Sequence, residues 1–460
     1  MRVLMWIIIA TAAVNPAQAQ LRLPGAPLPA LPTPKLTQAI GQTANSLEQL
    51  KDVRLLQIAN LIRANPRTIA ADPHGNPVVR DELLAFSPSA KGLEAAQALG
   101  FRILREQTFE DLDIRLLVLQ PPANKALAKA LRQLREADPA GTYDFNHIYL
   151  GGGTVLSPAP ADAPPRDTTS PNGTAPPASR VGLIDSGVDI AHPAFHDAVI
   201  HSWGCGDKIV ASVHGTAVAS LLLGHGTGFH GVLVGAELYA ANVYCDVPTG
   251  GAVDALAAAF SWLAKQRVAV INVSLVGPDN AALAAIVRTL TSLGYLLVAA
   301  VGNDGPAAPP LYPASYPRVV GVTAVDAHRR VLIEAARGKQ VMFAAPGADM
   351  VAADNGGKYS AVRGTSFAAP IVAALLAETV SAPDINASDA AVEALARHAI
   401  DLGPPGRDLT YGFGLVGAER ISASKEEMPT DGRINRFMPP IPPARPPPKP
   451  PPNPPPKPPA

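Results

Sequence analysis

A helix of small apolar residues, led by a glycine turn, is the feature that most limits how this chain can fold. After Gly364 the sequence runs Thr-Ser-Phe-Ala-Ala-Pro-Ile-Val-Ala-Ala-Leu-Leu-Ala, which predicts a tightly packed helix. Pro370 fits the first turns of such a helix, because the early N–H groups have no intrahelical partner. Ser366 then stands at the helix N-terminus, where free N–H groups and the helix dipole favour a developing negative charge. A serine there is also an ordinary N-cap, so Ser366 alone does not define a site.

Three other polar residues stand at the ends of apolar segments and would supply what a nucleophilic serine needs. Asp185 ends the apolar strand that begins at Val181, and a carboxylate there could hold an imidazole in one tautomer. His214 precedes a helix of small residues. Asn303 follows the buried strand 296–301, and its side-chain N–H could stabilise an oxyanion. The structural alternatives are turns for Asp185 and Asn303, and a structural or solvated role for one of the ten histidines.

Together the four motifs resemble those of the subtilisin-like serine proteases. They are Ile-Asp-Ser-Gly, His-Gly-Thr-Ala-Val-Ala, Val-Gly-Asn-Asp-Gly and Gly-Thr-Ser-Phe-Ala-Ala-Pro. The chain order Asp, His, Ser is that of subtilisin and not that of chymotrypsin or the α/β-hydrolases. The resemblance covers about residues 181–422 and implies an α/β fold, a parallel sheet flanked by helices. It also implies catalytic roles for Asp185, His214 and Ser366, with Asn303 in the oxyanion hole.

The same resemblance implies which residues would contact a peptide substrate. Two segments would flank the substrate backbone and its first side-chain pocket; they are Ser274, Leu275, Val276, Gly277, Ala300, Val301 and Gly302. Val276 and Val301 would narrow that pocket. The run His-Pro-Ala-Phe after Asp189 lacks the aspartate that helps to hold calcium in the family. We therefore expect no cofactor and no metal site, and calcium is the one metal that the resemblance leaves open.

Cys205 and Cys245 are the only cysteines in the sequence. An even number of cysteines in an exported protein favours a disulfide. Cys205 lies in the loop that leads to His214, and Cys245 follows the expected strand 239–244, so the two could approach each other. Two free buried thiols are the alternative.

The first residues and the charge balance predict where the protein acts. Residues 1–19 have the pattern of a secretory signal peptide, with Arg2 before an apolar stretch and an Ala-Gln-Ala site that ends at Ala19. The stretch is short for a transmembrane helix, which favours cleavage over the alternative of an uncleaved anchor. We therefore expect no transmembrane segment in the mature chain. A secreted, periplasmic or cell-envelope location follows. The 38 basic and 38 acidic side chains give no reason to expect a nucleic-acid partner.

Apolar spacing predicts a small α+β domain before the protease-like part. Residues 20–77 would form a linker and an amphipathic helix, and residues 78–150 a ferredoxin-like domain. Its strands and helices are expected in the order βαββαβ, over residues 78–86, 90–99, 101–109, 113–119, 125–136 and 143–150. By the family resemblance this domain is a propeptide, which assists folding and then inhibits by placing its last strand in the cleft. A ferredoxin-like binding module with no inhibitory role is the alternative.

Composition sets the remaining boundaries. Residues 151–180 are rich in Gly, Pro, Ala, Ser and Thr and predict a flexible linker, followed by a catalytic domain over 181–424. Residues 425–460 form a Pro-rich cationic tail, either a spacer or a tether to an anionic envelope surface. Because the linker can carry the chain to its own cleft, we expect self-cleavage between about Tyr149 and Arg180.

The sequence therefore predicts a secreted serine endopeptidase that acts on proteins or peptides through an acyl-enzyme. Its own N-terminal domain would be an intramolecular inhibitor. The alternative is a catalytically silent or self-inhibited protease-like protein that binds at the cell envelope. A lipase or esterase is disfavoured because the chain has no Gly-x-Ser-x-Gly motif.

Overall fold

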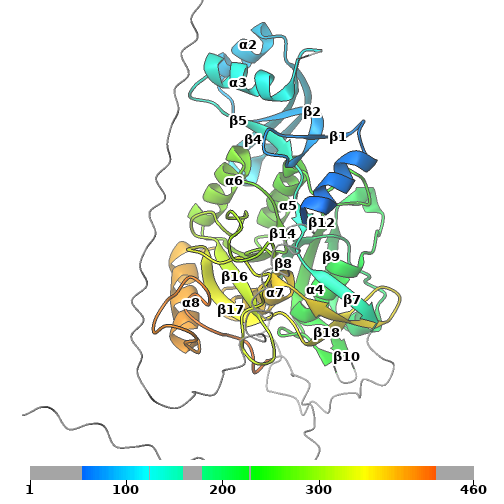
Figure 1. The fold of residues 1–460 in the computed structure, drawn as a ribbon, viewed down its shortest axis with the longest axis vertical. Helices are drawn as coiled ribbons and strands as arrows, with labels where there is room; N and C mark the ends of the chain where they lie inside the picture. The colour runs from blue at the N-terminus through cyan, green and yellow to red at the C-terminus, as the bar shows by residue number, and fades with distance from the viewer. Residues whose placement is uncertain (1–53, 124, 159–178, 227–228, 421–460) are drawn as a thin grey trace, which may run out of the picture.

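The structure, a computed structural model, describes residues 54–123, 125–158, 179–226 and 229–420. Figure 1 shows a smaller α+β body, coloured blue to cyan, above a larger α/β body. The expected signal peptide, the first part of the expected amphipathic helix and the Pro-rich tail lie outside the described residues.

The larger body is built on a seven-stranded sheet in which every neighbouring pair of strands is parallel. The strand order is β17-β16-β15-β13-β8-β12-β9. The strands are β8 (Arg180–Asp185), β9 (Val199–Trp203), β12 (Glu237–Asn242), β13 (Val270–Val273), β15 (Leu296–Ala300), β16 (Val320–Val325) and β17 (Val341–Pro346). The central strands are nearly continuous runs of apolar residues, as expected for strands covered on both faces.

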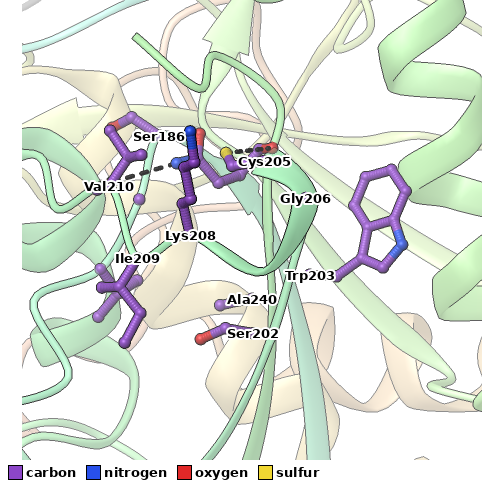
Figure 2. A pocket seen from close by; sticks show the side chains of 13 residues that line it. Ser186, Ser202, Trp203, Cys205, Gly206, Lys208, Ile209, Val210 and Ala240 are labelled. Atoms are coloured by element: carbon purple, nitrogen blue, oxygen red, sulfur yellow. Dashed lines mark hydrogen bonds between the residues drawn. The ribbon is translucent and has the colours of Figure 1, made fainter.

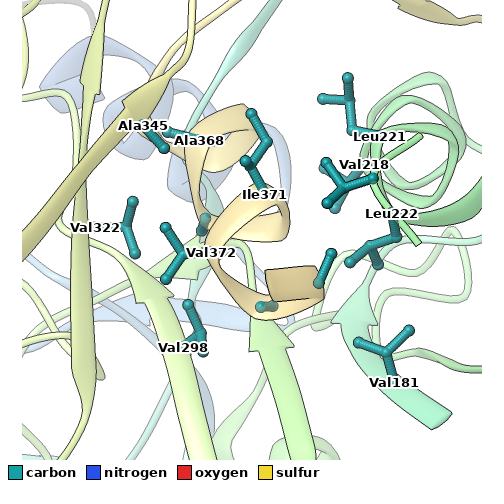
Figure 3. Packing of buried hydrophobic residues seen from close by; sticks show 14 of the residues in the cluster. Val181, Val218, Leu221, Leu222, Val298, Val322, Ala345, Ala368, Ile371 and Val372 are labelled. Carbon is teal, nitrogen blue, oxygen red and sulfur yellow. The ribbon is translucent and has the colours of Figure 1, made fainter. Parts of the chain in front are cut away.

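Helices cover both faces of this sheet, which confirms the predicted α/β fold. They are α4 (Val213–Leu223) and α7 (Thr365–Ala377) on one face, and α5 (Val253–Lys265) and α6 (Ala281–Ser292) on the other. Figure 3 shows α7 packed between Val298 and Val322 of the sheet and Leu221 of α4. Helix α8 (Ile385–His398) lies against α7.

Strand β8 shows how this layering places Asp185. Successive side chains of a strand point to opposite faces of the sheet. Val181 and Leu183 pack in the core on the α4/α7 face, and Ile184 packs on the α5/α6 face. Asp185 continues the first set, so it emerges on the α4/α7 side at the carboxyl end of the strand. The strand order reverses at β8, and the crevice at such a switch point is the usual ligand site of an open α/β sheet.

Helix α7 differs from the prediction at Pro370, which lies inside the helix and beyond its first turn. A residue there normally donates its N–H to the carbonyl four residues earlier, which is that of Ser366. Because proline has no N–H, that carbonyl needs another donor. Ser274 Oγ donates to it at 3.0 Å, so the proline leaves Ser366 tied to the neighbouring segment of the sheet.

The smaller body is an antiparallel sheet with two helices. Its elements are β1 (Ile69–Ala71), β2 (Pro77–Phe86), α2 (Ala90–Ala98), β3 (Arg102–Phe109), β4 (Ile114–Gln120), α3 (Leu127–Ala137) and β5 (Thr142–His147). The order β5-β2-β4-β3 is that of a ferredoxin-like split βαβ arrangement. Strand β1 and the helical residues 54–64 before it extend this domain into the region predicted as linker and helix.

The start of the predicted linker 151–180 is not a linker in the structure. Leu150–Gly151 form β6, which pairs antiparallel with β14 (Leu275–Val276) of the larger body. Thr154–Pro158 form β7, which pairs antiparallel with β19 (Tyr359–Arg363). The main chains of β14 and β19 supply the hydrogen bonds that hold these residues extended. The glycine-rich composition of the segment alone could not predict this pairing. The remaining short elements are η1 (Glu110–Leu112), η2 (Pro193–Phe195), η3 (Cys205–Asp207), β10 (His225–Gly226), β11 (Phe229–His230) and β18 (Met350–Ala353).

Strand β5 of the smaller body caps two helices of the larger one. Helix α5 begins without a side-chain cap of its own, and Asn146 Oδ1 accepts the Asp254 N–H in its first turn at 3.3 Å. Asp144 Oδ2 accepts the Ala281 N–H at the start of α6 at 2.7 Å. Both acceptors lie on the same face of β5, two residues apart. Since helix N-termini carry unpaired N–H groups and the positive end of the dipole, both contacts stabilise the docking of the two bodies.

We predict that Asp144→Ala lowers the free energy of unfolding of the full chain by about 1 kcal/mol, a typical cost of losing a helix cap. Urea unfolding followed by circular dichroism measures it, on a Ser366→Ala background that excludes the self-cleavage expected from the sequence. Glu94→Ala, at an exposed position of α2, is the matched control and should change stability by less than about 0.5 kcal/mol. Equal effects of the two substitutions would contradict the capping role.

Candidate active site

Asp185 and His214 form a buried hydrogen-bonded pair. His214 Nδ1 lies 2.8 Å from Asp185 Oδ1. The His214 side chain is 17% exposed and that of Asp185 is 2% exposed. The Ser186 N–H and Oγ donate to the same carboxylate oxygen at 2.6 and 2.9 Å. These donors fix the carboxylate, and the carboxylate fixes the imidazole with its Nε2 atom facing away.

The environment of His214 makes it a stronger base than an ordinary histidine. Burial lowers the pKa of His214, but the Asp185 charge and hydrogen bond raise it by more, so the net pKa lies above its usual 6.5. His214 Nε2 is buried and has no hydrogen-bond partner in the described part of the chain. The nitrogen that would accept a proton is therefore free to do so.

Ser366 lies at the start of α7, and its hydroxyl is weakly held. Ser366 Oγ donates to the Ser274 carbonyl at 3.3 Å, which is long for a hydroxyl donor. The next residue, Phe367, has its ring centroid 5.4 Å from that of His214, so the imidazole lies beside this helix end. A hydroxyl with one long bond can turn to another acceptor at small cost.

Asn303 is oriented by the same helix end. Its Oδ1 accepts the Thr365 N–H at 3.0 Å, which fixes the amide plane. Its Nδ2 is buried and, among the described residues, has no hydrogen-bond partner. A buried donor without a partner costs free energy unless an acceptor arrives, so this atom has the character of an oxyanion donor.

The residues predicted to contact substrate divide into two groups in the structure. Ser274 and Gly277 flank β14, whose Leu275 and Val276 pair with β6 of the same chain. Ala300 ends β15, and the Gly302 N–H donates to Thr365 Oγ1 at 3.2 Å, beside Asn303.

Val301 differs from the expectation that it narrows the first pocket. It is fully buried in the core on the α5/α6 face. Its Cγ1 would lie 3.3 Å from a Cβ placed on Gly321, so this side chain points into the sheet and not toward Ser366.

Residues 148–153 of the chain pass directly over these groups. Ile148 forms an antiparallel bridge with Ala252, and the Tyr149 N–H donates to the Gly251 carbonyl at 2.8 Å. With β14 on its other side, the segment is the middle strand of three.

The glycines of this segment face the base and the nucleophile in turn. A Cβ placed on Gly151 would lie 3.9 Å from atoms of the His214 ring, and one placed on Gly152 would lie 3.1 Å from Ser366 Oγ. A Cβ on Gly364 would lie 3.2 Å from Asn303 Nδ2 and 3.3 Å from the Gly152 carbonyl oxygen, so these two atoms border the same point.

Gly152 was not among the site residues predicted from the sequence, although it lies within the range 149–180 predicted for self-cleavage. The signal that could have found it is the run Tyr-Leu-Gly-Gly-Gly after the last predicted strand of the small domain, at residues 149–153.

Cys205 and Cys245 form a disulfide with their Cα atoms 5.1 Å apart. Beside it lies a cavity of about 540 Å³ that Figure 2 shows between Trp203, Lys208 and Ile209. The loop that carries these residues continues into α4 and His214, so the disulfide anchors the segment before the base. Ser366 is not among the residues that line this cavity. The residue that lies against the Ser366 hydroxyl is Gly152.

Two kinds of feature are absent from the described residues. No group of three or more His, Cys, Asp or Glu side chains is arranged to hold a metal ion there. In that same portion of the chain, no helix has the length and apolar character needed to cross a membrane.

Comparison with known proteins decides the family. The sequence profile of the subtilase family matches residues 178–414. The chain belongs to the subtilase family. Within this subtilase, the matched residues contain the Asp185–His214 pair, Asn303 and Ser366.

Similar curated proteins come from bacilli. Subtilisin DY of Bacillus licheniformis is 31% identical over 249 residues, which are 52% of this subtilase and 89% of that protein. The minor extracellular protease Epr of Bacillus subtilis is 30% identical over 244 residues, 52% of this chain and 37% of Epr. Subtilisin E of the same organism is 31% identical over 254 residues, which are 52% of this chain and 64% of subtilisin E. This subtilase thus spans less than two thirds of Epr and subtilisin E.

A solved structure extends the likeness beyond the family segment. Fervidolysin from Fervidobacterium pennivorans superimposes with a TM-score of 0.61 and 20% sequence identity, over 75% of this chain and 61% of fervidolysin. At this identity the likeness shows a shared fold.

We predict that replacing Cys205 and Cys245 together by serine lowers the free energy of unfolding by about 4 kcal/mol, because the bridge closes a loop with a sequence separation of 40. Guanidinium unfolding of the Ser366→Ala chain measures the loss. Reduction of the parent protein should reproduce it, and the double variant should not respond to reductant. Two titratable thiols in the unreduced, unfolded parent would contradict the bridge.

Proposed function

We propose that this subtilase is a serine endopeptidase that hydrolyses peptide bonds of proteins and peptides, and that its own chain is its first substrate. The observation that carries the proposal is the position of Gly152, whose neighbours are the Ser366 hydroxyl and Asn303 Nδ2, an atom without a hydrogen-bond partner among the described residues. A base, a nucleophile and an oxyanion donor thus surround one peptide group.

In the proposed reaction Ser366 Oγ attacks the carbonyl carbon of the scissile peptide while its proton passes to His214 Nε2. The carbonyl oxygen becomes an oxyanion and accepts a hydrogen bond from Asn303 Nδ2. Asp185 stabilises the imidazolium. When the tetrahedral intermediate collapses, the C–N bond breaks and His214 gives its proton to the departing amine.

Hydrolysis of the acyl-enzyme repeats these steps with water. His214 takes a proton from the attacking water, and the ester bond to Ser366 breaks as the hydroxyl regains a proton. Nucleophile, base and oxyanion donor all come from the protein, so the reaction needs no cofactor.

The bond proposed for self-cleavage is Gly152–Gly153. A Cβ placed on Gly152 would lie 3.1 Å from Ser366 Oγ, and the Gly152 carbonyl borders Asn303 Nδ2. Strand β6 holds the chain before this bond and β7 holds it after the bond. A tethered segment reaches the site at an effective concentration in the millimolar range, so intramolecular cleavage is favoured.

After cleavage the small domain would remain as an inhibitor. Asp144 and Asn146 would still cap α6 and α5, and Tyr149 would still fill its place beside Gly251. The product would thus keep substrates out of the cleft until the fragment dissociates or is degraded.

The catalytically silent alternative leaves the site geometry unexplained. Buried polar atoms without partners lower stability. In the part of the chain that the structure describes, His214 Nε2 and Asn303 Nδ2 are two such atoms near one peptide group. A binding protein would gain nothing from keeping them.

We propose export as the setting of this activity. The signal-like residues 1–19 support it, and so does the name of Epr, an extracellular protease. The disulfide supports it too, since such bonds persist in oxidising compartments.

We predict that Ser366→Ala lowers peptidase turnover about 10⁶-fold. Asn303→Ala should lower it by about 10²–10³-fold, because one oxyanion donor is lost. Hydrolysis of a quenched fluorescent protein substrate measures both, and Asn386→Ala, at an exposed asparagine of α8, is the matched control that should retain wild-type turnover. Wild-type turnover by Ser366→Ala would overturn the proposed function.

We also predict a pH profile set by His214. The base must be neutral to accept a proton, so kcat/KM falls as the pH drops through the pKa of His214. Because the net pKa is raised, the midpoint of this acidic limb should lie above pH 6.5.

Replacement of the Asp185 carboxylate tests whether its charge raises the pKa of His214. In Asp185→Asn burial remains and the carboxylate charge is gone, so the His214 pKa should fall below 6.5, as read from its imidazole NMR signals in the Ser366→Ala background. An unmoved pKa would contradict the assignment of Asp185.

A further inference from the structure

We propose that the side chains of Ser274 and Asn272 position the nucleophile, and that they replace a helix N–H group that Pro370 cannot supply. This inference rests on the proposed function and adds two positioning residues to it. Both act on Ser366 from the neighbouring part of the sheet, and neither is assigned a place among the reacting atoms.

Ser274 holds Ser366 at two points. Its Oγ donates to the Ser366 carbonyl at 3.0 Å, and its own carbonyl accepts from Ser366 Oγ at 3.3 Å. Both residues are fully buried, so bulk water cannot take the place of either bond. The main chain and the hydroxyl of the nucleophile are thus both aligned on one neighbouring residue.

The bond to the Ser366 carbonyl is needed because of Pro370. In an α-helix this carbonyl would accept the N–H of residue 370, but Pro370 lies inside α7 and has none. Without a substitute donor, nothing would fix the tilt of the peptide unit that leaves Ser366. The hydroxyl extends from the same residue, and a misplacement of about 1 Å in an active site can cost about 10²-fold in rate.

Asn272 directs the Ser274 hydroxyl toward its acceptor. Asn272 Nδ2 donates to Ser274 Oγ at 2.8 Å. A hydroxyl has one proton, so a serine oxygen that already accepts from Asn272 keeps that proton for the Ser366 carbonyl. Asn272 lies in β13, which is paired on one side with β8 and on the other with β15, so its backbone is firmly held.

The surroundings of Asn272 argue for a role in activity. The side chain is fully buried within the otherwise apolar strand Val270–Val273. Its Oδ1 has no hydrogen-bond partner among the described residues. Such an atom costs free energy that an apolar side chain would avoid, so stability alone does not account for an asparagine here. The bond to Ser274 does.

Two double-mutant cycles test the inference. Each variant is expressed as the full chain, and kcat and KM are measured after processing, on a quenched peptide with the chain's own residues 147–156. Turnover is expressed per folded molecule, as determined by circular dichroism, so that a folding defect is not counted as lost turnover. Ser220→Ala is the matched control, because Ser220 is equally buried and its hydroxyl also donates to a main-chain carbonyl, that of Ala217.

The first cycle combines Ser274→Ala with Pro370→Ala. In the parent, Ser274→Ala should lower kcat about 10- to 100-fold and change KM by less than about threefold, because the peptide still binds and the nucleophile is misplaced. In the Pro370→Ala background residue 370 regains an N–H that can donate to the Ser366 carbonyl, so the same substitution should cost less than about threefold. A purely structural role for Ser274 would change the folded fraction and leave kcat per folded molecule unmoved.

The second cycle combines Asn272→Ala with Ser274→Ala. Asn272→Ala should lower kcat about fivefold in the parent, the equivalent of one hydrogen bond, and have no further effect when Ser274→Ala is present. Its effect should also disappear in the Pro370→Ala background, which tests the inference even if Ser274→Ala yields no folded protein. Ser220→Ala should leave kcat unchanged in the parent and in the Pro370→Ala background.

A Ser274→Ala protein with the parent kcat would overturn the inference, and so would equal losses of kcat in the parent and Pro370→Ala backgrounds. Additive losses from Asn272→Ala and Ser274→Ala would overturn the role of Asn272. In all of these cases the peptidase function stands. A parent protein that cuts the peptide no faster than a Ser366→Ala blank would instead overturn the proposed function itself.

Discussion

The antiparallel pairing of β6 with β14 is the contact on which the account depends. It fixes Leu150 and Gly151 by main-chain hydrogen bonds, which carry no preference for side chains, and thereby sets which residue reaches Ser366. A shift of the β6–β14 register by one residue would exchange the two faces of the segment, and the side chain of Tyr149 would leave its buried position. The pairing of β7 with β19 holds the chain beyond the bond, so a peptide group lies across the nucleophile with both sides restrained.

The contact between the two bodies has an apolar part and a polar part. Leu84, Leu116 and Val118 of the smaller body share one buried cluster with apolar residues of α5 and α6. Arg105 donates to both Glu82 and Asp254, and Asn146 donates to the same two carboxylates. Two buried acids side by side are tolerable only with such donors between them. On separation, water can solvate these polar groups and the helix ends that β5 caps, which lowers the free-energy cost of releasing the small domain.

The positions of the candidate site residues were easier to predict from the sequence than the path of the chain over them. Asp185 and Ser366 stand at the ends of strongly patterned segments, so their motifs and the layering of the fold were readable. Gly152 was assigned to a linker because composition does not show which distant strands a segment will pair with. The strands on either side of Gly152, β6 and β7, pair with β14 and β19 of the larger body. Val301 was placed in the pocket by its motif, whereas strand alternation puts it in the core. Pro370 illustrates the same limit. It leaves the Ser366 carbonyl without its usual donor in the helix, and the donor that replaces it is Ser274, which lies far away in the sequence.

The mass of the processed chain tests the central claim most directly. Wild type and Ser366→Ala are expressed side by side in a protease-free system, and the intact masses of all products are measured. The account predicts that wild type gives a fragment ending at Gly152 and a mature chain beginning at Gly153, and that Ser366→Ala remains whole. Equal processing of both chains, or a wild-type cut at another bond, would contradict it.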